Sequence, residues 1–220
     1  MSRRLHYHYI MGYVKGLFCL WEHDNIFLWN PSIRKSIILP KPGITKKTHD
    51  SLADDLGFGY DLRSNDYKVV RIVTRCGSDR SQDDESPLVE VYSLKAGSWK
   101  MNRGAGESFP LGFRIAYSQN FTSCLEGVLH WAAKAKGNWN NRLVLSFDLC
   151  VEVFKTIKMP NGLESARFDI TTSVFGGFLS LLCEDNVDRA NKSCSIWIMK
   201  EYGVVDSWYK YVKIDLTGGM

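Results

Sequence analysis

The sequence predicts an all-β protein. Segments rich in β-branched and aromatic residues recur along the whole chain, and breaks rich in glycine, asparagine, aspartate and serine separate them. No window shows the long apolar spacing, with caps, that an amphipathic helix needs. An aromatic residue of a strand–turn–strand unit returns about every 55 residues, at Trp99, Phe154 and Trp208, close to the roughly 50-residue period of kelch-type blades. Together these observations predict a kelch-like β-propeller, complete or partial, with about four blades of four antiparallel strands.

The first predicted cycle begins with a glycine-led apolar strand, Gly16–Trp21, and continues with an aromatic strand, Asn25–Trp29. Asn30–Ser32 supplies the turn, because asparagine favours turn initiation and Pro31 fixes φ and removes a backbone donor. Lys35–Leu39 then returns as the next strand. The aromatic ring and cations of this stretch are therefore explained by strand–turn–strand construction, without a ligand site.

Three further cycles follow the same plan. The second opens with the strands Leu56–Tyr60 and Asn65–Val70, and the others open with the glycine-led strands Gly127–Trp131 and Gly177–Leu182. Each closes with an aromatic strand, a polar turn and a strand carrying an aromatic and a lysine, in the stretches Val91–Lys100, Ser146–Lys155 and Trp197–Lys210. Blades stacked around an axis share a continuous core. The recurring aromatic residues are therefore predicted to pack between blades, with ligand stacking as the alternative.

Composition limits the classes of function. The chain has 220 residues, 45% of them hydrophobic, so it can build a substantial core. The net charge of +4 comes from scattered lysines and arginines, so the basic balance alone does not decide the class of partner. No apolar run is long enough for a signal peptide or a membrane span. The six cysteines form no Cys-x-x-Cys pair and mostly lie in apolar strands, which favours buried free thiols and a cytoplasmic or nuclear protein.

Two polar stretches are candidate partner-binding surfaces. Cys76–Pro87 is the most polar segment, and its charges could contact a basic partner or a cation; a solvated loop is the alternative. Ala133–Arg142 is predicted to be a basic loop that carries a tryptophan, a residue type that, with arginine, is enriched at interface hot spots. A buried packing role for that tryptophan is the alternative. The predicted partner-binding residues are Asp79, Arg80, Asp83, Asp84, Glu85, Trp139 and Arg142.

No catalytic, cofactor or metal site is predicted. His6 and His8 share a face if their segment is a strand, but a third metal ligand is not evident. His130 lies between two apolar residues and is expected to be a core residue hydrogen-bonded to the backbone. Gly57–Gly59 lacks the third glycine and the following helix of a phosphate-binding loop.

Two alternative functions belong to other classes. A propeller-fold hydrolase would use axial carboxylates such as Asp61, Asp148 and Asp169, although their places in the repeat predict turns. An RNA-binding β domain would need solvent-facing aromatic platforms flanked by lysines.

Five short motifs resemble the plant F-box-associated domain, the first of them containing its WNPS-x-R signature. In order they are Leu28–Lys35; Leu56–Asp61 with Asn65–Val70; Val89–Leu94 with Ser98–Lys100; Gly127–Trp131; and Ser146–Leu149. Each motif is short, but five in the expected order make a specific match over most of the chain. Within that family the chain is most similar to S-locus F-box-like proteins.

The resemblance implies a propeller-like domain that recognises a target protein for ubiquitination and is not an enzyme. In the family this domain follows an N-terminal F-box, which docks on the adaptor subunit of an SCF ubiquitin ligase. We expect an N-terminal tail at residues 1–11 and an incomplete F-box-associated domain at residues 12–217. No F-box is detected before Gly12, so contact with the ligase adaptor is expected only if an F-box is supplied elsewhere. No cofactor, nucleic acid or membrane is implied as a partner.

Overall fold

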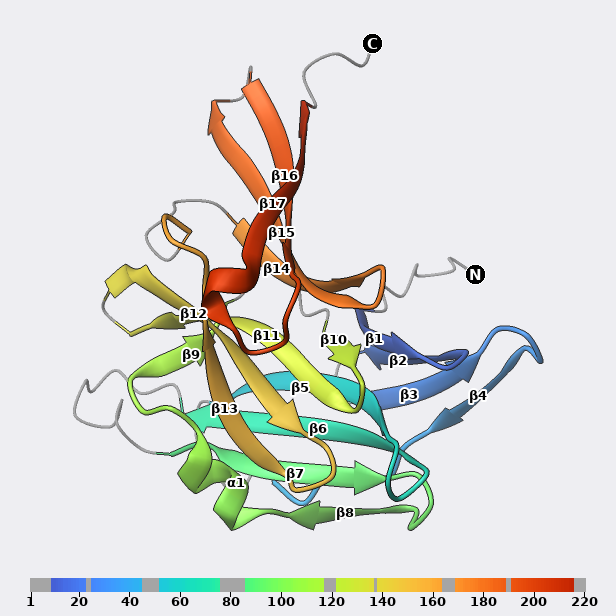
Figure 1. The fold of residues 1–220 in the computed structure, drawn as a ribbon. Coiled ribbons are helices and arrows are strands. Elements are labelled where there is room, and N and C mark those ends of the chain that lie inside the picture. The colour runs from blue at the N-terminus through green and yellow to red at the C-terminus, as the bar shows by residue number, and fades with distance from the viewer. Residues whose placement is uncertain are drawn as a thin grey trace, which may run out of the picture.

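Four antiparallel sheets follow one another along the chain, and we name them blades A to D (Figure 1). The computed structural model describes residues 9–22, 25–44, 52–75, 86–116, 122–136, 138–163, 169–188 and 191–215. Within each blade, strands that are neighbours in sequence pair with each other. The predicted all-β fold, a propeller of four four-stranded blades, is confirmed. Among the described residues, no helix is long and apolar enough to cross a membrane.

The blades have these strands. Blade A consists of β1 (Tyr9–Val14), β2 (Leu17–Glu22), β3 (Asn25–Asn30) and β4 (Lys35–Ile38). Blade B consists of β5 (Leu52–Asp61), β6 (Asp66–Arg75), β7 (Leu88–Ser93) and β8 (Ser98–Met101). Blade C consists of β10 (Ser123–Leu125), β11 (Val128–Ala135), β12 (Asn138–Asp148) and β13 (Val153–Lys158). Blade D consists of β14 (Asp169–Phe175), β15 (Phe178–Asp188), β16 (Asn191–Met199) and β17 (Trp208–Asp215).

Some elements were not predicted. A short strand, β9 (Phe113–Ile115), pairs with the end of β11 that β10 leaves free, so blade C has a fifth strand. A short helix, α1 (Arg103–Ser108), lies in the link between blades B and C, and the side chain of Asn102 caps its first turn by accepting from the backbone N–H of Ala105. The first strand, β1, begins at Tyr9, three residues before the predicted start of the domain at Gly12, and that boundary stays a prediction.

The glycine that opens each glycine-led strand belongs to a hairpin turn. In blades A, C and D the φ angle is 82° at Gly16, 81° at Gly127 and 84° at Gly177, and the residue before each glycine also has a positive φ. Two-residue hairpins whose twist matches that of the strands require positive φ at both central residues, which glycine adopts without a Cβ clash. The recurring glycine is thus explained by the turn between the first and second strands of a blade.

Three hydrophobic clusters lie between successive blades. One joins blade A to blade B and includes Cys19 and Phe58. The second joins B to C and includes Val70 and Phe147, and the third joins C to D. Each inner blade therefore buries both faces of its sheet. We name the face toward the preceding blade the leading face and the face toward the following blade the trailing face.

The aromatic residues with the 55-residue spacing all lie on fourth strands and contact the segment that leaves the preceding blade. The Nε1 atom of Trp99 donates to the carbonyl oxygen of Pro40 at 2.7 Å, and that of Trp208 donates to the carbonyl oxygen of Lys158 at 3.1 Å. The ring of Phe154 lies 5.2 Å from that of Phe109, which follows α1. These rings are not solvent-facing platforms of the kind RNA stacking requires, so the inter-blade packing that the sequence predicts is confirmed.

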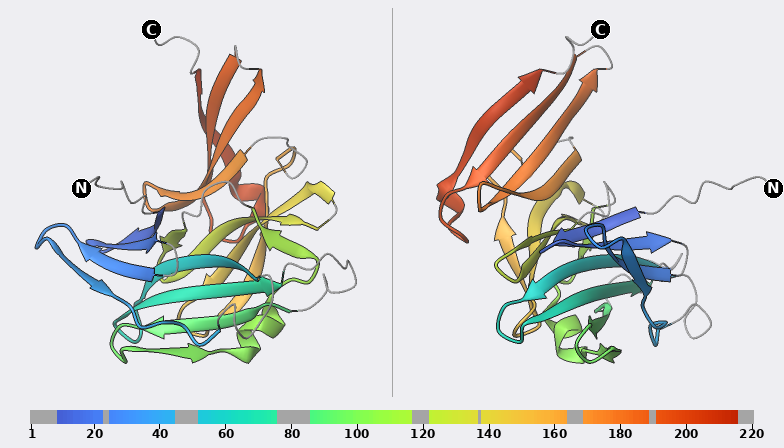
Figure 2. Two further views of the ribbon diagram at one scale, coloured as in Figure 1. Left: turned by 180° about the vertical axis from the view of Figure 1, so that it is seen from behind. Right: turned by 90° about the vertical axis from the view of Figure 1, so that its right-hand side faces the viewer.

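Blade D packs against blade C and projects toward the top of Figure 1, and the views from behind and from the side show the same arrangement (Figure 2). Blade A lies at the other end of the series, with β4 at its outer edge.

Candidate functional site

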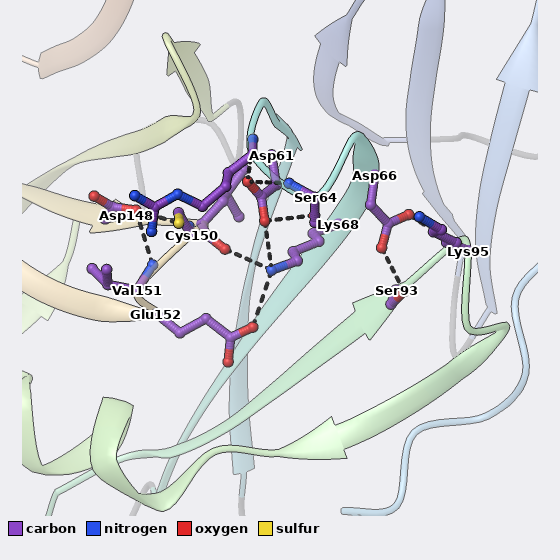
Figure 3. A network of polar contacts seen from close by, with 12 residues as sticks. Asp61, Ser64, Asp66, Lys68, Ser93, Lys95, Asp148, Cys150, Val151 and Glu152 are labelled. Carbon is purple, nitrogen blue, oxygen red and sulfur yellow. Dashed lines mark hydrogen bonds and ion pairs between the residues drawn. The ribbon is translucent and has the colours of Figure 1, made fainter.

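The densest polar network in Figure 3 joins blades B and C at their turns. The Nζ atom of Lys68 lies 3.0 Å from Oδ2 of Asp61 and 3.2 Å from Oε1 of Glu152. The same ammonium donates to the carbonyl oxygen of Leu149 at 2.6 Å. Burial alone would lower the pKa of Lys68, but the hydrogen bonds to Asp61 and Glu152 raise it above its usual range. The lysine is therefore a charged link between two blades.

The carboxylates of this region hold turns. Asp61 accepts hydrogen bonds from the backbone N–H groups of Arg63 and Ser64 and from the Ser64 hydroxyl. Burial would raise the pKa of Asp61, but these bonds and that from Lys68 outweigh it, so the pKa lies below its usual range. Asp148 likewise accepts from two backbone N–H groups of the β12–β13 turn. Both aspartates lie at turns, as the sequence predicts, and neither is placed as the free general base or nucleophile that a hydrolase would need.

A second ion cluster ties blade B to the segment that leaves blade A. The guanidinium of Arg71 donates to Oε2 of Glu90 at 2.8 Å, to Oδ2 of Asp54 at 2.9 Å and to the carbonyl oxygen of Ile44 at 2.8 Å. Oε1 of Glu90 in turn accepts from the backbone N–H groups of Gly43 and Ile44. Each of these side chains has a partner within the cluster, although Oδ1 of Asp54 is buried without a hydrogen bond among the described residues. We assign the cluster to the stability of the A–B junction.

Asp55 is a carboxyl group with a strongly shifted pKa. It lies in β5 two residues before Gly57, so its side chain shares the face of Gly57 that packs against Trp131 of blade C. Burial raises the pKa of Asp55 to about 7, and the nearby carboxylate of Asp54 adds to the effect. The folded protein therefore holds a proton here that the unfolded chain releases near pH 4.

Replacing Asp55 with asparagine is expected to change the pH dependence of stability. Between about pH 4 and pH 7 the folded state binds more protons than the unfolded state at this site, so its contribution to stability falls as the pH rises. A shift from 4 to 7 is worth about 4 kcal/mol in a fully buried group, and partial solvent contact reduces this to about 2 kcal/mol. The free energy of unfolding of Asp55→Asn minus that of the parent should rise by this amount across the window in chemical denaturation.

The comparison with the parent is needed because His130, whose pKa is lowered, makes stability rise with pH over part of the same window. The exposed Asp206→Asn is the matched control and should follow the parent. If the free energy of unfolding changed equally with pH in the parent and in Asp55→Asn, the raised pKa assigned to Asp55 would be contradicted.

His130 is fully buried, as the sequence predicts, and its side chain also contacts blade D. Nε2 lies 2.8 Å from the hydroxyl of Tyr202, in the β16–β17 connection of blade D. Burial lowers the pKa of His130 to about 4, so the ring is neutral at physiological pH. The Thr172 hydroxyl donates to the backbone carbonyl of His130 at 2.8 Å, a second link between blades C and D. Packing between blades, and not nucleophile activation, accounts for this histidine.

No group of three or more metal-binding side chains gathers within the described ranges. His6 and His8 lie outside those ranges, as does Cys76. The other five cysteines are free thiols, namely Cys19, Cys124, Cys150, Cys183 and Cys194.

Three cations lie on neighbouring strands of blade C, near the β11–β12 turn. Lys134 of β11 pairs directly with Arg114 of β9 on one side and with Arg142 of β12 on the other. Cross-strand partners project from the same face, so the three side chains form one row on blade C. We name this set the basic row. All three are half-buried.

The three positive charges of the basic row repel one another. Burial lowers the pKa of Lys134, and Arg114 and Arg142 lower it further, while Asp169 at the start of β14 acts in the opposite direction. Burial also lowers the pKa of Arg142, again with Asp169 opposing. Like charges placed directly opposite each other cost stability. Asp169 already offsets part of this repulsion, and an acidic side chain of a partner protein would offset more of it.

Two of the seven predicted partner-binding residues, Trp139 and Arg142, lie within the described ranges, and Arg142 belongs to the basic row. Trp139 was predicted to lie in a loop, which is wrong for its backbone, because it falls within β12. Asn138 pairs with Ala135, and the next pair is Arg142 with Lys134. Three residues of β12 therefore bulge out opposite none of β11, and Trp139 is one of these three. The other five predicted residues lie outside the described ranges: Asp79, Arg80, Asp83, Asp84 and Glu85.

Two members of the row, Arg114 and Lys134, were not singled out from the sequence. Arg114 is 20 residues before Lys134, and only the pairing of β9 with β11 brings them together. The one available signal was the run of basic residues from Lys134 to Arg142.

The F-box associated beta propeller domain matches residues 1–216. The chain belongs to this family. The resemblance drawn from the five sequence motifs is thereby confirmed at the level of the plant F-box-associated domain; the S-locus F-box-like subgroup stays a prediction.

Relatives of this F-box-associated domain chain come from Arabidopsis thaliana. The F-box protein CPR1 is 32% identical over 213 residues, covering 91% of this chain and 51% of that protein. The F-box/kelch-repeat protein At3g23880 is 28% identical over 211 residues, covering 94% of this chain and 53% of that protein. The chain therefore spans about half the length of these curated relatives. Among solved structures, Porphyromonas gingivalis dipeptidyl peptidase 4 aligns with a TM-score of only 0.39 at 9% identity, over 89% of this chain and 37% of that one, and carries no argument.

Proposed function

We propose that this F-box-associated domain recognises a target protein for an SCF-type ubiquitin ligase and has no catalytic role of its own. The family match over residues 1–216 carries the proposal, since proteins of this family that resemble the chain are F-box proteins. The arrangement of the described carboxylates and of His130 agrees with it, because these groups hold turns or link blades. We further propose that the domain acts in the cytoplasm or nucleus, with the ligase adaptor contacted only through an F-box.

We propose the basic row as part of the target-binding surface. Loops and strand ends at one end of a rigid scaffold are common recognition surfaces. Arg142 and Lys134 present mutually repelling charges there. Trp139 and the acidic stretch Asp79–Glu85 are also proposed to contact the target protein.

Charge reversal tests this proposal. The parent chain and Arg142→Glu would be used to capture proteins from plant extract, with quantification by mass spectrometry. We expect a specific protein to bind the parent and to be captured at least about tenfold less by the variant, as for loss of a desolvated charge contact. Arg63→Glu, an exposed arginine in the β5–β6 turn, is the matched control and should capture as the parent does.

A second step separates recognition from mere binding. The captured protein would be offered to a reconstituted ligase in which the chain is fused behind the F-box of CPR1. Ubiquitination of the captured protein by the parent fusion, and its loss with Arg142→Glu, supports target recognition. Failure of a folded parent to capture any specific protein would overturn the proposed function, whereas equal capture by Arg142→Glu would overturn only the proposed surface.

A further inference from the structure

The basic row faces the junction between blades C and D. Side chains alternate along β11 between the two faces of the sheet. Ala133 packs in the cluster shared with blade B, and Ala132 packs in the cluster shared with blade D. Lys134 comes two residues after Ala132 and therefore projects on the side of blade D. Its cross-strand partners Arg114 and Arg142 share that side, so the basic row forms part of one wall of the C–D junction.

Blade D contributes a further cation from the opposite wall. Trp197 of β16 packs against the C–D cluster and pairs across the sheet with Lys210 of β17. Cross-strand partners project from the same face, so Lys210 also lies on the face toward blade C. Its Nζ atom is 5.3 Å from the centre of the Trp197 ring, and the residue is exposed.

A buried thiol shows that the two walls approach each other at this point. Cys183 of β15 belongs to the C–D cluster and is 1% exposed. Burial raises the pKa of this thiol to about 12, and Arg142 of blade C and Lys210 of blade D both oppose that shift. The two cations therefore act on one buried group from opposite walls.

The indole of Trp197 is a buried donor without an acceptor. Its Nε1 atom has no hydrogen-bond partner among the described residues. The indoles of Trp99, Trp131 and Trp208, by contrast, each donate to a backbone carbonyl oxygen. Buried polar groups are nearly always paired. A donor left without a partner beside Lys210 points to an acceptor that comes from outside the chain.

We propose that this end of the C–D junction binds a phosphate monoester carried by a side chain of the target protein, an inference that rests on the proposed function. A phosphorylated side chain carries about −1.5 to −2 charges at neutral pH and three acceptor oxygens. It can accept from the indole and from cations of both walls at the same time. A carboxylate brings one charge and two oxygens, and Asp169 already places one carboxylate near Lys134 and Arg142.

The indole signal of Trp197 reports on this site directly. The folded, ¹⁵N-labelled chain would be titrated with O-phosphoserine in a buffer without phosphate, and the N–H signals of its seven tryptophans recorded by NMR. Serine is the matched control ligand, because it lacks only the phosphoryl group. Trp197→Phe identifies the signal by its loss. We expect O-phosphoserine to shift the Trp197 signal saturably and serine to leave it in place.

A variant of the opposite wall tests the source of the affinity. Lys210→Met should weaken binding of O-phosphoserine at least about tenfold, as for loss of a charge-assisted contact. Lys100→Met, an exposed lysine on β8 of blade B, is the matched control and should bind as the parent does. Circular dichroism would first show that each variant is folded. The absence of a saturable shift, an equal shift with serine, or an unchanged affinity in Lys210→Met overturns the proposal.

Phosphatase treatment tests whether the target protein carries the phosphoryl group. Plant extract would be dephosphorylated before the parent chain is used to capture proteins from it, with untreated extract alongside. We expect the specific protein to be captured from untreated extract alone. Capture that survives the treatment overturns the target side chain as the source and leaves the proposed function standing. Absence of any captured protein overturns the proposed function, and the Trp197 signal then decides by itself whether the junction binds a phosphate monoester.

Discussion

Replacing Arg71 with methionine is expected to lower the free energy of unfolding by about 3–5 kcal/mol. The arginine is nearly buried, and its guanidinium makes the hydrogen bonds to Glu90, Asp54 and Ile44 that close the A–B junction. Methionine fills a similar volume but leaves the carboxylate of Glu90, only 3% exposed, without its cation. An uncompensated buried charge costs far more than the net contribution of the ion pair itself. Chemical denaturation of parent and variant measures the loss.

Two further variants define the cause. In Arg71→Met with Glu90→Gln the buried charge is removed along with its partner, so this double variant should recover a large part of the loss. Arg103→Met, an exposed arginine at the start of α1, should change stability by less than about 0.5 kcal/mol. A loss for Arg71→Met no greater than that of Arg103→Met would contradict the role assigned to the cluster.

Phe154→Ala is expected to be similarly costly, at about 3–5 kcal/mol. The ring is 3% exposed and meets Phe147 at 4.7 Å and Phe109 at 5.2 Å between centroids, so its removal opens a cavity between blades B and C. The measurement also separates packing from ligand stacking, because a ring held for a ligand could be removed with little loss of stability. Val151→Ala, at an exposed position of the adjoining turn, serves as the control and should differ little from the parent.

The strands of the repeat could be predicted because their signals are local. A run such as Val69–Val73 combines β-branched residues with bounding turns, and the glycines and asparagine of the hairpins mark where strands end. The helix α1 could not be predicted, since it has only six residues, two of them glycines, and no apolar period. Its position depends on Gly106, whose Cα lies so close to Pro87 that a Cβ would be 2.4 Å from the carbonyl oxygen.

The contacts of the candidate site were harder to predict from the sequence than the strands were. Arg71 interrupts an apolar strand, which signals a buried charge. Its contact with Glu90 depends on the register of β6 against β7, and its contact with Ile44 depends on how blade A's exit segment crosses blade B. The basic row likewise needs the register of β9 against β11, which joins residues from separate parts of the chain. Arg142 was found because it lies in a visibly basic stretch; its neighbours were missed because sheet pairing, not sequence distance, places them.

The contact between each fourth-strand aromatic and the exit segment of the preceding blade has a consequence for synthesis on the ribosome. Trp99, Phe154 and Trp208 are each made after the segment they pack against, so every new blade emerges with its docking surface already in place. The chain can therefore be assembled in the order of translation, one blade at a time. Until the next blade emerges, the newest trailing face is exposed to solvent, and nascent chains on neighbouring ribosomes present the same surface to one another.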